Sequence, residues 1–403
     1  MCDNEKFVYE IINSIYKGIE PLIVETKKYA YISDPVLDVK RNRVVAETLK
    51  AIIRLDLDSK DLMQKLANYL MKTQNKDGSW NEIHPNYDKP SALITSIVAE
   101  SLILFYKKSP NKKLKKSIVK AAKYVISQNK KSGYFLKSKT YTADHLNVDA
   151  TCGAFLALYG KLFSDKKSIN IAKNAAKHIC KNQFENGAYP YAVTKGNYSQ
   201  TLDVSCVHYQ GVTIYYLSKI NQVISEKWLK DSLIRGVEWL SKAQKSNGKF
   251  DWSKSGLMFA YCLSGAYAFA YSSFSYISKF KKEYAKNSEL CLLNIKSNAG
   301  SLVFRWEKES WLTFPLSTID SLKTAKIGDY SRRYILFRFG YALYRQIARR
   351  RISERIDGRP FKIFTKILKL KTSTVESFTN HPDLFMSSEI LDCLSYSLVE
   401  ERA

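Results

Sequence analysis

The sequence predicts an all-α fold in which six helical hairpins close into a double ring, an (α/α)6 barrel. Four helix-like segments each end in a Gln that is followed within a few residues by a Gly and an aromatic residue. The steps between these Gln residues are 54, 55 and 61 residues, long enough for two helices and their turns. Hydrophobic residues make up 45% of the chain, which is enough for a large core. Units of this kind cannot bury their apolar faces alone, so they must stack on one another.

The repeated pattern has a structural interpretation. Gly permits a tight or left-handed turn after a helix, the Gln side chain can bond loose backbone groups, and the aromatic ring can pack on the neighbouring pair. We therefore interpret these residues as parts of the scaffold rather than as catalytic residues. The four copies are Gln74…Gly78-Ser-Trp80, Gln128…Gly133-Tyr134-Phe135, Gln183…Gly187-Ala-Tyr189 and Gln244…Gly248-Lys-Phe250.

Each copy follows a helix with one apolar face and precedes a second, more apolar helix. The second helices are poor in Lys, as expected for an inner ring, and are predicted at Ser91–Tyr106, Val148–Phe163, Leu202–Ile220 and Gly256–Tyr276. Two further pairs lack a clear copy of the pattern. They are Phe7–Ile23 with Leu37–Leu55, and Leu290–Ser297 with Tyr330–Arg351. This makes six outer and six inner helices.

The ring is predicted to form one domain over residues 1–350, with residues 351–403 as a basic C-terminal extension. From Ser321 to Lys371 there are 15 Lys or Arg against three acids. Phe361–Leu370 reads as a short basic amphipathic segment, which is typical of helices that lie on anionic lipid. The alternative is an outer barrel helix followed by a capping tail.

Composition limits the partners and the compartment. The balance of 64 Lys+Arg against 38 Asp+Glu gives a formal charge of +26, which favours an anionic partner or simply a lysine-rich solvated surface. The seven Cys form no CxxC pair and no dense framework, and the N-terminus lacks a signal-peptide pattern. We expect a cytoplasmic protein, peripheral at a membrane if the basic region binds lipid. The uncharged stretch Gly256–Ile277 is interpreted as an inner helix rather than a membrane span.

The repeat resembles the α/α-toroid superfamily, which includes terpenoid cyclases and protein prenyltransferase β subunits. Asn75–Trp80 is the closest match, and the resemblance covers roughly residues 1–350. It implies the barrel, which sugar-processing enzymes such as polysaccharide lyases, uronyl epimerases and inverting hydrolases also use. The cyclases of this superfamily carry an acidic Asp-x-Asp-Asp run. The nearest string here, Asp56-Leu-Asp58-Ser59, has one carboxylate fewer. The prenyltransferase zinc site is not carried over, because Asp203, Cys206 and His208 fall on one predicted helix.

Candidate acid/base residues lie where the inner helices begin. Asp149-Ala-Thr-Cys152 and Asp203-Val-Ser-Cys206 repeat one pattern in consecutive units, so Asp149 and Asp203 are predicted to form an acid/base pair about 8–10 Å apart. The alternative is that both acids cap helix N-termini. His145, His208 and Tyr209 are further catalytic candidates, because a His beside a Tyr can take and return a proton at carbon. The alternative is an interior His that only forms hydrogen bonds.

Substrate-binding candidates are basic and aromatic. Arg41 and Arg43 lie near the start of the first inner helix and could clamp a carboxylate or phosphate. Aromatic rings that follow the repeated pattern offer flat faces for sugar rings, or could instead shield a carbocation. The aromatic candidates are Tyr189, Tyr191, Trp252 and Tyr261. No P-loop, dinucleotide, HExxH or GxSxG motif appears, so we expect no cofactor.

These observations favour an enzyme that acts on an acidic or lipid-linked carbohydrate polymer by epimerase, lyase or hydrolase chemistry. An isoprenoid enzyme of the cyclase or prenyltransferase type is the first alternative, and a non-catalytic glycan-binding scaffold is the second. A polar groove would fit sugars, whereas a deep dry pocket would fit isoprenoids. Although His145, Asp149, Asp203 and His208 include metal-binding residue types, their spacing is not tight and we expect no metal. Sequence-specific nucleic-acid binding is not expected.

Overall fold

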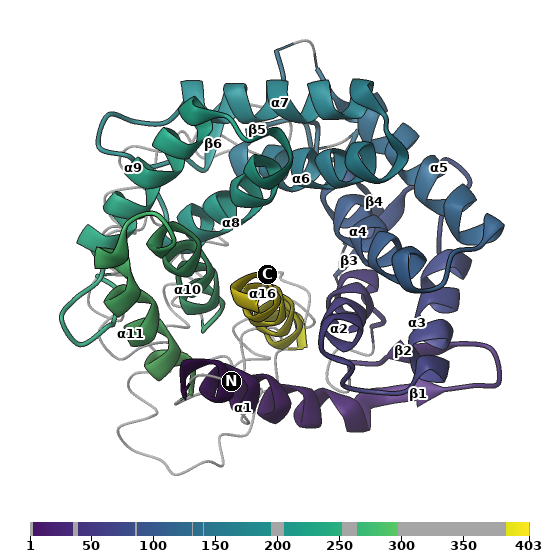
Figure 1. The fold of residues 1–403 in the computed structure, drawn as a ribbon. Coiled ribbons are helices and arrows are strands. Elements are labelled where there is room, and N and C mark those ends of the chain that lie inside the picture. The colour runs from purple at the N-terminus through teal and green to yellow at the C-terminus, as the bar shows by residue number, and fades with distance from the viewer. Residues whose placement is uncertain are drawn as a thin grey trace, which may run out of the picture.

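The computed structural model describes residues 3–34, 39–84, 87–130, 132–139, 141–194, 205–251, 264–296 and 384–402. These residues form two concentric rings of helices (Figure 1). The described inner helices are α2 (Asn42–Leu55), α4 (Ala92–Lys108), α6 (Leu146–Phe163), α8 (Val207–Ile224), α10 (Ser264–Ser278) and α16 (Leu384–Arg402). The described outer helices are α1 (Asp3–Ile19), α3 (Lys60–Lys72), α5 (Lys112–Gln128), α7 (Lys166–Lys181), α9 (Lys227–Ala243) and α11 (Ala285–Lys296). The predicted all-α toroid is confirmed.

The inner helices contact one another in the order α2, α4, α6, α8, α10 and α16, and α16 returns to α2. The outer helices are amphipathic, and the apolar face of α3 (Leu62, Leu66 and Leu70) is buried. The inner helices are apolar on most of their surface because they are covered on both sides. Among the described helices, none combines the length and the hydropathy of a membrane span.

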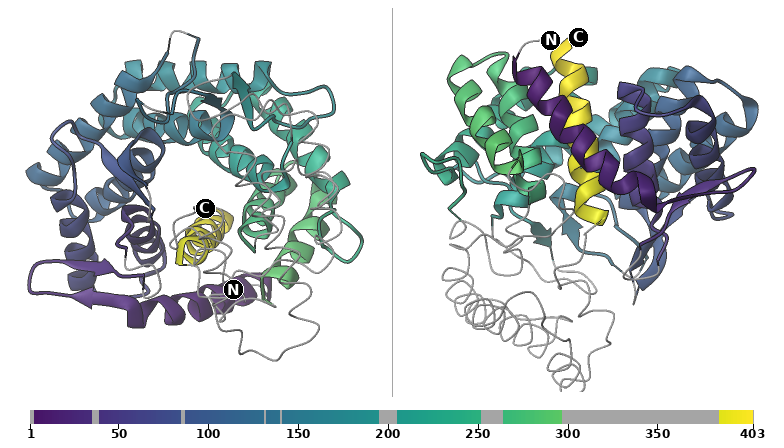
Figure 2. Two further views of the ribbon diagram at one scale, coloured as in Figure 1. Left: turned by 180° about the vertical axis from the view of Figure 1, so that it is seen from behind. Right: turned by 90° about the horizontal axis from the view of Figure 1, so that it is seen from below.

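The two kinds of connection differ in length and place the loops at one end of the ring. Inner helices pass to outer helices through tight turns, and α2, α6 and α8 end in left-handed residues, Asp56, Ser164 and Ser225. Outer helices pass to inner helices through long connections that carry short antiparallel hairpins (Figure 2). The hairpins pair β1 (Ile23–Glu25) with β2 (Ala30–Ile32) and β3 (Trp80–His84) with β4 (Tyr87–Ser91). The strands β5 (Asp144–His145) and β6 (Ala192–Thr194) come from two successive connections and pair with each other. Two short 3-10 helices are η1 (Glu20–Leu22) and η4 (Lys282–Tyr284).

The last inner helix corrects the predicted domain boundary. Residues 351–403 were expected outside the ring, but α16 packs inside it, between α10 and α2 and against α1 (Figure 1). Its Glu389 and Asp392 pair with basic residues of α2, and most of its residues are buried. The helices predicted at Phe7–Ile23 and Leu37–Leu55 correspond to α1 and α2; α1 packs on α16, and α2 packs on α16, α4 and α3. The segments Tyr330–Arg351 and Phe361–Leu370 lie outside the described residues.

The repeated pattern joins consecutive outer helices. Gln74 Nε2 donates to the carbonyl oxygens of Gly78 (2.9 Å) and of Ser117 in α5 (3.0 Å). The side chain of Ser117 donates back to Gln74 Oε1 at 2.8 Å. In the second copy Asn129, not Gln128, bonds the glycine carbonyl. The remaining copies repeat the first arrangement: Gln183 with Gly187 and Ser232, and Gln244 with Gly248 and Asn287. The scaffold interpretation agrees with these contacts.

The glycine of the pattern is required for two reasons, its backbone conformation and the close approach of the next outer helix. All four copies have positive φ, between 81° and 104°. At Gly187 a Cβ would lie 2.2 Å from the carbonyl oxygen of Arg235 in the next outer helix, and at Gly133 it would lie 2.9 Å from that of Asn174. Only glycine permits both the left-handed backbone and the close approach of the next helix.

Replacing Gly187 by alanine is expected to lower the free energy of unfolding by about 2–4 kcal/mol, from left-handed strain and overpacking together. Gly133→Ala serves as the matched comparison, because it has the same strain but a milder steric conflict, and its loss should be smaller. Urea unfolding at neutral pH measures both. Equal stability of the two variants would contradict the role given to the close approach.

Candidate functional site

The candidate site lies at the end of the barrel where the inner helices begin, which we call the mouth. Polar and aromatic residues from successive elements form a continuous row of rings there, the mouth row: Tyr141, His145, Tyr191, Tyr209 and His208. Ring centroids are 5.3 Å apart from Tyr141 to His145 and 4.6 Å from His145 to Tyr191. They are 4.6 Å apart from Tyr191 to Tyr209 and 5.0 Å from Tyr209 to His208. The row therefore links the start of α6 to the start of α8.

Four of the sequence-predicted candidates meet in this row. His145 directly precedes α6 and pairs in β5 with β6, which follows closely after Tyr191. His208 and Tyr209 occupy the first turn of α8. The three tyrosines of the row are partly exposed, whereas His145 and His208 are 1% and 4% exposed. The row thus offers ring faces and hydroxyls, with two imidazoles set more deeply.

Both imidazoles are held neutral near pH 7. Burial lowers the pKa of His145 to about 3, and the charge of Lys137 acts in the same direction. Burial lowers the pKa of His208 to about 3 as well, assisted by Arg43. A neutral imidazole is the form that can accept a proton.

Charged residues lie at both ends of the mouth row. At one end Lys137 forms an ion pair with Glu82 (2.9 Å) and lies 5.0 Å from the centroid of the Tyr141 ring. At the other end His208 Nε2 is 4.0 Å from Glu389 Oε2, and Glu389 is bound by Arg43. Each of these two carboxylates is therefore paired with a base.

The two predicted anion-binding arginines have different environments. Arg43 is held by Glu47 (2.6 Å) and Glu389, and its guanidinium stacks 4.1 Å from the centroid of Phe385. Its donors are therefore largely committed within the protein. Arg41 is buried, has a distant contact with Asp34 (3.9 Å), and its Nε has no hydrogen-bond partner among the described residues. Arg41 is the better candidate to receive an anion.

Asp149 lies apart from the mouth row. Its Oδ1 accepts the backbone N–H of Phe135 at 2.6 Å, and its Oδ2 is 4.0 Å from His178 of the outer helix α7. The equivalent backbone N–H groups of the other copies bond to Thr95, Gln210 and Tyr267. Asp149 therefore occupies a scaffold position of the repeat: it binds a loop N–H rather than one at the start of α6, and its side chain is directed toward the outer layer.

Among the remaining predicted residues, Tyr189 lies outside the row. Tyr189 is 2% exposed, and its hydroxyl bonds to Ser232 of α9, because it is the aromatic residue of the repeated pattern and packs between hairpins. Asp203, Trp252 and Tyr261 lie outside the described residues. The proposed pairing of Asp149 with Asp203 consequently has only one described member.

Beneath the mouth a buried set of charges joins the inner helices across the barrel axis. This axial network consists of Lys50 and Arg54 from α2, Glu100 from α4, Lys219 from α8 and Asp392 from α16. Lys219 is 2.7 Å from Glu100, and Arg54 is 2.6 Å from Asp392. Lys50 contacts Asp392 and lies 3.4 Å from Glu100. The barrel interior in this region is therefore lined by charged side chains and is not an apolar pocket.

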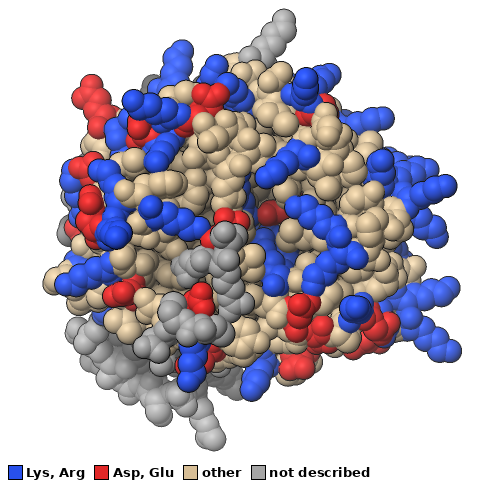
Figure 3. Space-filling view, viewed as in Figure 1, with Lys and Arg blue, Asp and Glu red and all other residues tan. Residues whose placement is uncertain are grey.

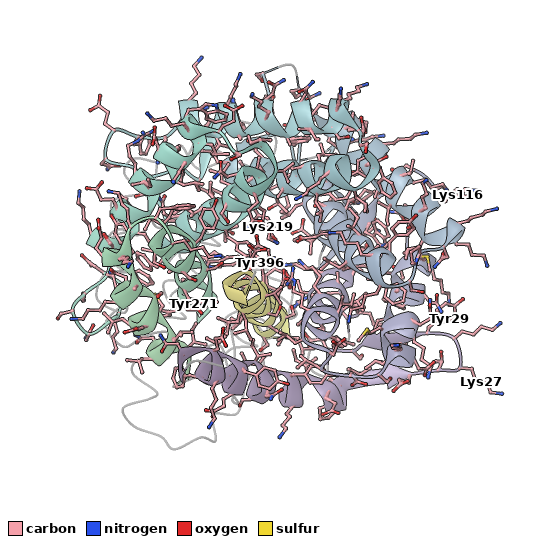
Figure 4. The ribbon with its side chains drawn as sticks, viewed as in Figure 1. Lys27, Tyr29, Lys116, Lys219, Tyr271 and Tyr396 are labelled. Atoms are coloured by element: carbon pink, nitrogen blue, oxygen red, sulfur yellow. The ribbon has the colours of Figure 1, made fainter. Side chains whose placement is uncertain are left out.

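Burial and pairing act in opposite directions in the axial network. Burial alone would raise the pKa of Asp392, but the charges of Lys50 and Arg54 outweigh it and hold that pKa well below its usual range. Burial lowers the pKa of Lys219. The ammonium of Lys219 lies 4.3 Å from the ring centroid of Tyr215 and 4.5 Å from that of Tyr396. The Lys219 side chain points toward the axis of the barrel (Figure 4).

Sequence reasoning missed Glu82, Lys137 and Glu389. They come from a strand, a loop and the last inner helix, and no motif spacing connects residues so far apart in the chain. Lys and Arg spread over much of the face shown in Figure 3, with acids among them, as expected for a solvated lysine-rich surface.

The sequence matches no protein-family model and no curated protein. Solved structures match the fold. An unsaturated glucuronyl hydrolase specific for heparin aligns over 76% of this chain and 86% of its own, with a TM-score of 0.56 and 13% identity. Cellobiose 2-epimerase from Bacillus thermoamylovorans aligns over 72% and 87%, with a TM-score of 0.59 and 12% identity. The Lin0763 protein from Listeria innocua aligns over 98% and 97%, with a TM-score of 0.57 and 12% identity.

At these identities the likeness shows the fold alone. It agrees with the α/α-toroid part of the resemblance seen in the sequence. The names of the first two structures describe sugar-acting enzymes, and none of the three is named as a terpenoid cyclase or prenyltransferase. The chain is an (α/α)6 toroid.

Proposed function

We propose that the protein is an enzyme that acts on carbohydrate, with the mouth row as its sugar-binding surface. The observation that carries this proposal is the unbroken line of rings from Tyr141 to His208, with charged residues at both ends. Tyrosine rings present an apolar face to the C–H groups of a sugar and a hydroxyl to its oxygens. Solved structures of the same fold include proteins named as a glucuronyl hydrolase and a cellobiose epimerase, which adds support.

The substrate class we favour is an acidic sugar, such as a uronate-containing oligosaccharide. Arg41 offers a buried Nε that no described residue binds, and a guanidinium recognises a carboxylate well. The formal charge of +26 favours the approach of an anion. A bound carboxylate near His145 or His208 would also raise the low pKa of that imidazole, because a nearby negative charge favours the protonated form.

Proton transfer at carbon, as in epimerisation or β-elimination, fits the mouth better than hydrolysis by two carboxylates. His145 and His208 are neutral and could accept and return a proton, with Tyr209 beside His208. The carboxylates at the two ends of the mouth row, Glu82 and Glu389, are engaged by Lys137 and Arg43. Asp149 is directed toward Phe135 and α7.

An isoprenoid substrate is less well supported. The axial network places Lys50, Glu100 and Lys219 in the barrel interior, where a hydrocarbon chain would have to lie. Moving an isoprenoid chain from water to a site beside buried charges gains little hydrophobic free energy, and that free energy is what would bind such a substrate.

The test is incubation of the purified full chain in D2O with uronate oligosaccharides, neutral oligosaccharides and polyprenyl diphosphates in parallel. Mass spectrometry and NMR follow the products. Proton transfer at carbon incorporates deuterium at the reacting carbon, or gives an unsaturated sugar, whereas hydrolysis adds the elements of water. Turnover of uronates with one of the first two signatures is expected. Turnover of diphosphates alone would overturn the proposal, and binding without turnover would favour the glycan-binding scaffold.

A further inference from the structure

Behind the mouth row three potential metal ligands meet from three different elements. Asp144 lies in β5, Asp149 in the first turn of α6 and His178 in the last turn of the outer helix α7. One ligand atom of each lies within 4.8 Å of the others. His178 Nε2 is 2.8 Å from Asp144 Oδ2 and 4.0 Å from Asp149 Oδ2. The cluster is separate from the mouth row and uses none of its rings.

The two carboxylates are deeply buried and lack partners for part of their oxygens. Asp144 is 1% exposed and Asp149 is fully buried. Asp144 Oδ1 and Asp149 Oδ2 have no hydrogen-bond donor among the described residues, and no Lys or Arg of those ranges forms an ion pair with either acid. Two adjacent buried carboxylates with one imidazole are short of positive charge.

We propose that Asp144, Asp149 and His178 bind a divalent cation, best matched by Zn²⁺. Carboxylate oxygen and imidazole nitrogen are both normal zinc ligands at about 2.0–2.2 Å, so tetrahedrally placed ligand atoms lie about 3.4 Å apart. The observed separations of 2.8 and 4.0 Å bracket that value. A dication also neutralises the two carboxylates. The imidazole nitrogen favours Zn²⁺ over Mg²⁺ and Ca²⁺, which prefer ligand sets made of oxygen alone.

The surroundings indicate a structural role for this cation. Asp149 Oδ1 remains bonded to the backbone N–H of Phe135, so Asp149 has only Oδ2 to give to the metal. The cation would tie the start of α6 to α7, and it would fix the residue directly before His145. It would therefore position one end of the mouth row without touching a substrate.

The experiment measures metal content independently of turnover. The full chain is stripped with a chelator, reloaded separately with Zn²⁺, Mn²⁺ and Mg²⁺, desalted and analysed by elemental mass spectrometry. One Zn²⁺ per chain is expected, together with a melting temperature that rises as Zn²⁺ is added, because the ligand binds the folded state. Co²⁺ in the same site should give the visible d–d absorption of a tetrahedral nitrogen and oxygen ligand set.

Asp144→Asn and His178→Gln should each weaken Zn²⁺ binding at least tenfold, because each removes a ligand with little change in volume. Asp231→Asn, an exposed carboxylate on the outer helix α9, is the matched control and should keep wild-type binding. Equal binding by all three variants would place the metal elsewhere and overturn the proposal. If a ligand variant fails to fold, the wild-type Co²⁺ spectrum decides, and its absence overturns the proposal as well.

Discussion

Replacing Asp392 by asparagine is expected to lower the free energy of unfolding by about 3–5 kcal/mol, because it leaves buried cations without their counter-charge. Asp392 accepts from Lys50 and from Arg54, and Lys50 is fully buried. The pKa of Asp392 is held well below its usual range, so the carboxylate stays charged at neutral pH and the removed interaction is ionic. Urea unfolding at neutral pH measures the loss.

The same substitution should loosen the closure of the ring. Asp392 is on α16, and its partners are on α2, so hydrogen exchange of α16 amides should accelerate more than that of α6 amides. Glu238→Gln is the control, because the Glu238–Lys242 pair is exposed on α9, where solvent screens its interaction. A loss at Asp392 no larger than the loss at Glu238 would show that the axial network does not hold the ring closed.

His145→Gln is expected to lower kcat/KM by about 10²–10⁴-fold if His145 transfers a proton in the proposed reaction. Glutamine has a similar size and polarity but cannot take up a proton near neutral pH, so the fold should be retained. Activity is measured on the substrate that the D2O screen identifies, with melting temperature as the check on folding.

The pH dependence provides a second, independent readout. kcat/KM reports the free enzyme, in which burial lowers the pKa of His145 to about 3. The base form persists above that pKa, so lowering the pH from about 8 to about 5 should not cost activity through His145, unlike an ordinary histidine. Tyr159→Phe, at the far end of α6, is the control and should keep full activity. Full activity of His145→Gln would remove His145 from the catalytic role.

The regular part of the fold was predictable because it repeats. The predicted inner helices at Ser91–Tyr106 and Val148–Phe163 correspond to α4 and α6 with ends shifted by two residues at most. The repeated pattern marks each turn, and the φ values of Gly78 and its counterparts explain why glycine is needed there. The last inner helix was missed because it carries no copy of the pattern. Its acids, Glu389 and Asp392, have meaning only beside the bases of α2.

The candidate site was predictable in part. His145, His208 and Tyr209 were expected from the position of inner-helix starts, and Tyr191 from the aromatic residues that follow the repeated pattern. The four lie together in the mouth row. The acid/base role predicted for Asp149 assumed a side chain that faces the mouth, whereas the side chain is directed toward the outer layer. A polar residue in a first helical turn can face the barrel axis or the outer layer, and the sequence pattern carries no signal for the rotation of the helix about its own axis.

The sequence by itself determined a closed double ring, because the period, the apolar faces and the Gln–Gly–aromatic turns act between residues that are near in the chain. The tertiary structure decided which helix completes the ring and which polar groups meet at the mouth. Those outcomes depend on contacts such as that of Arg43 with Glu389, which are 346 residues apart. Buried charges select their partners by proximity in three dimensions, and a linear pattern does not record that proximity.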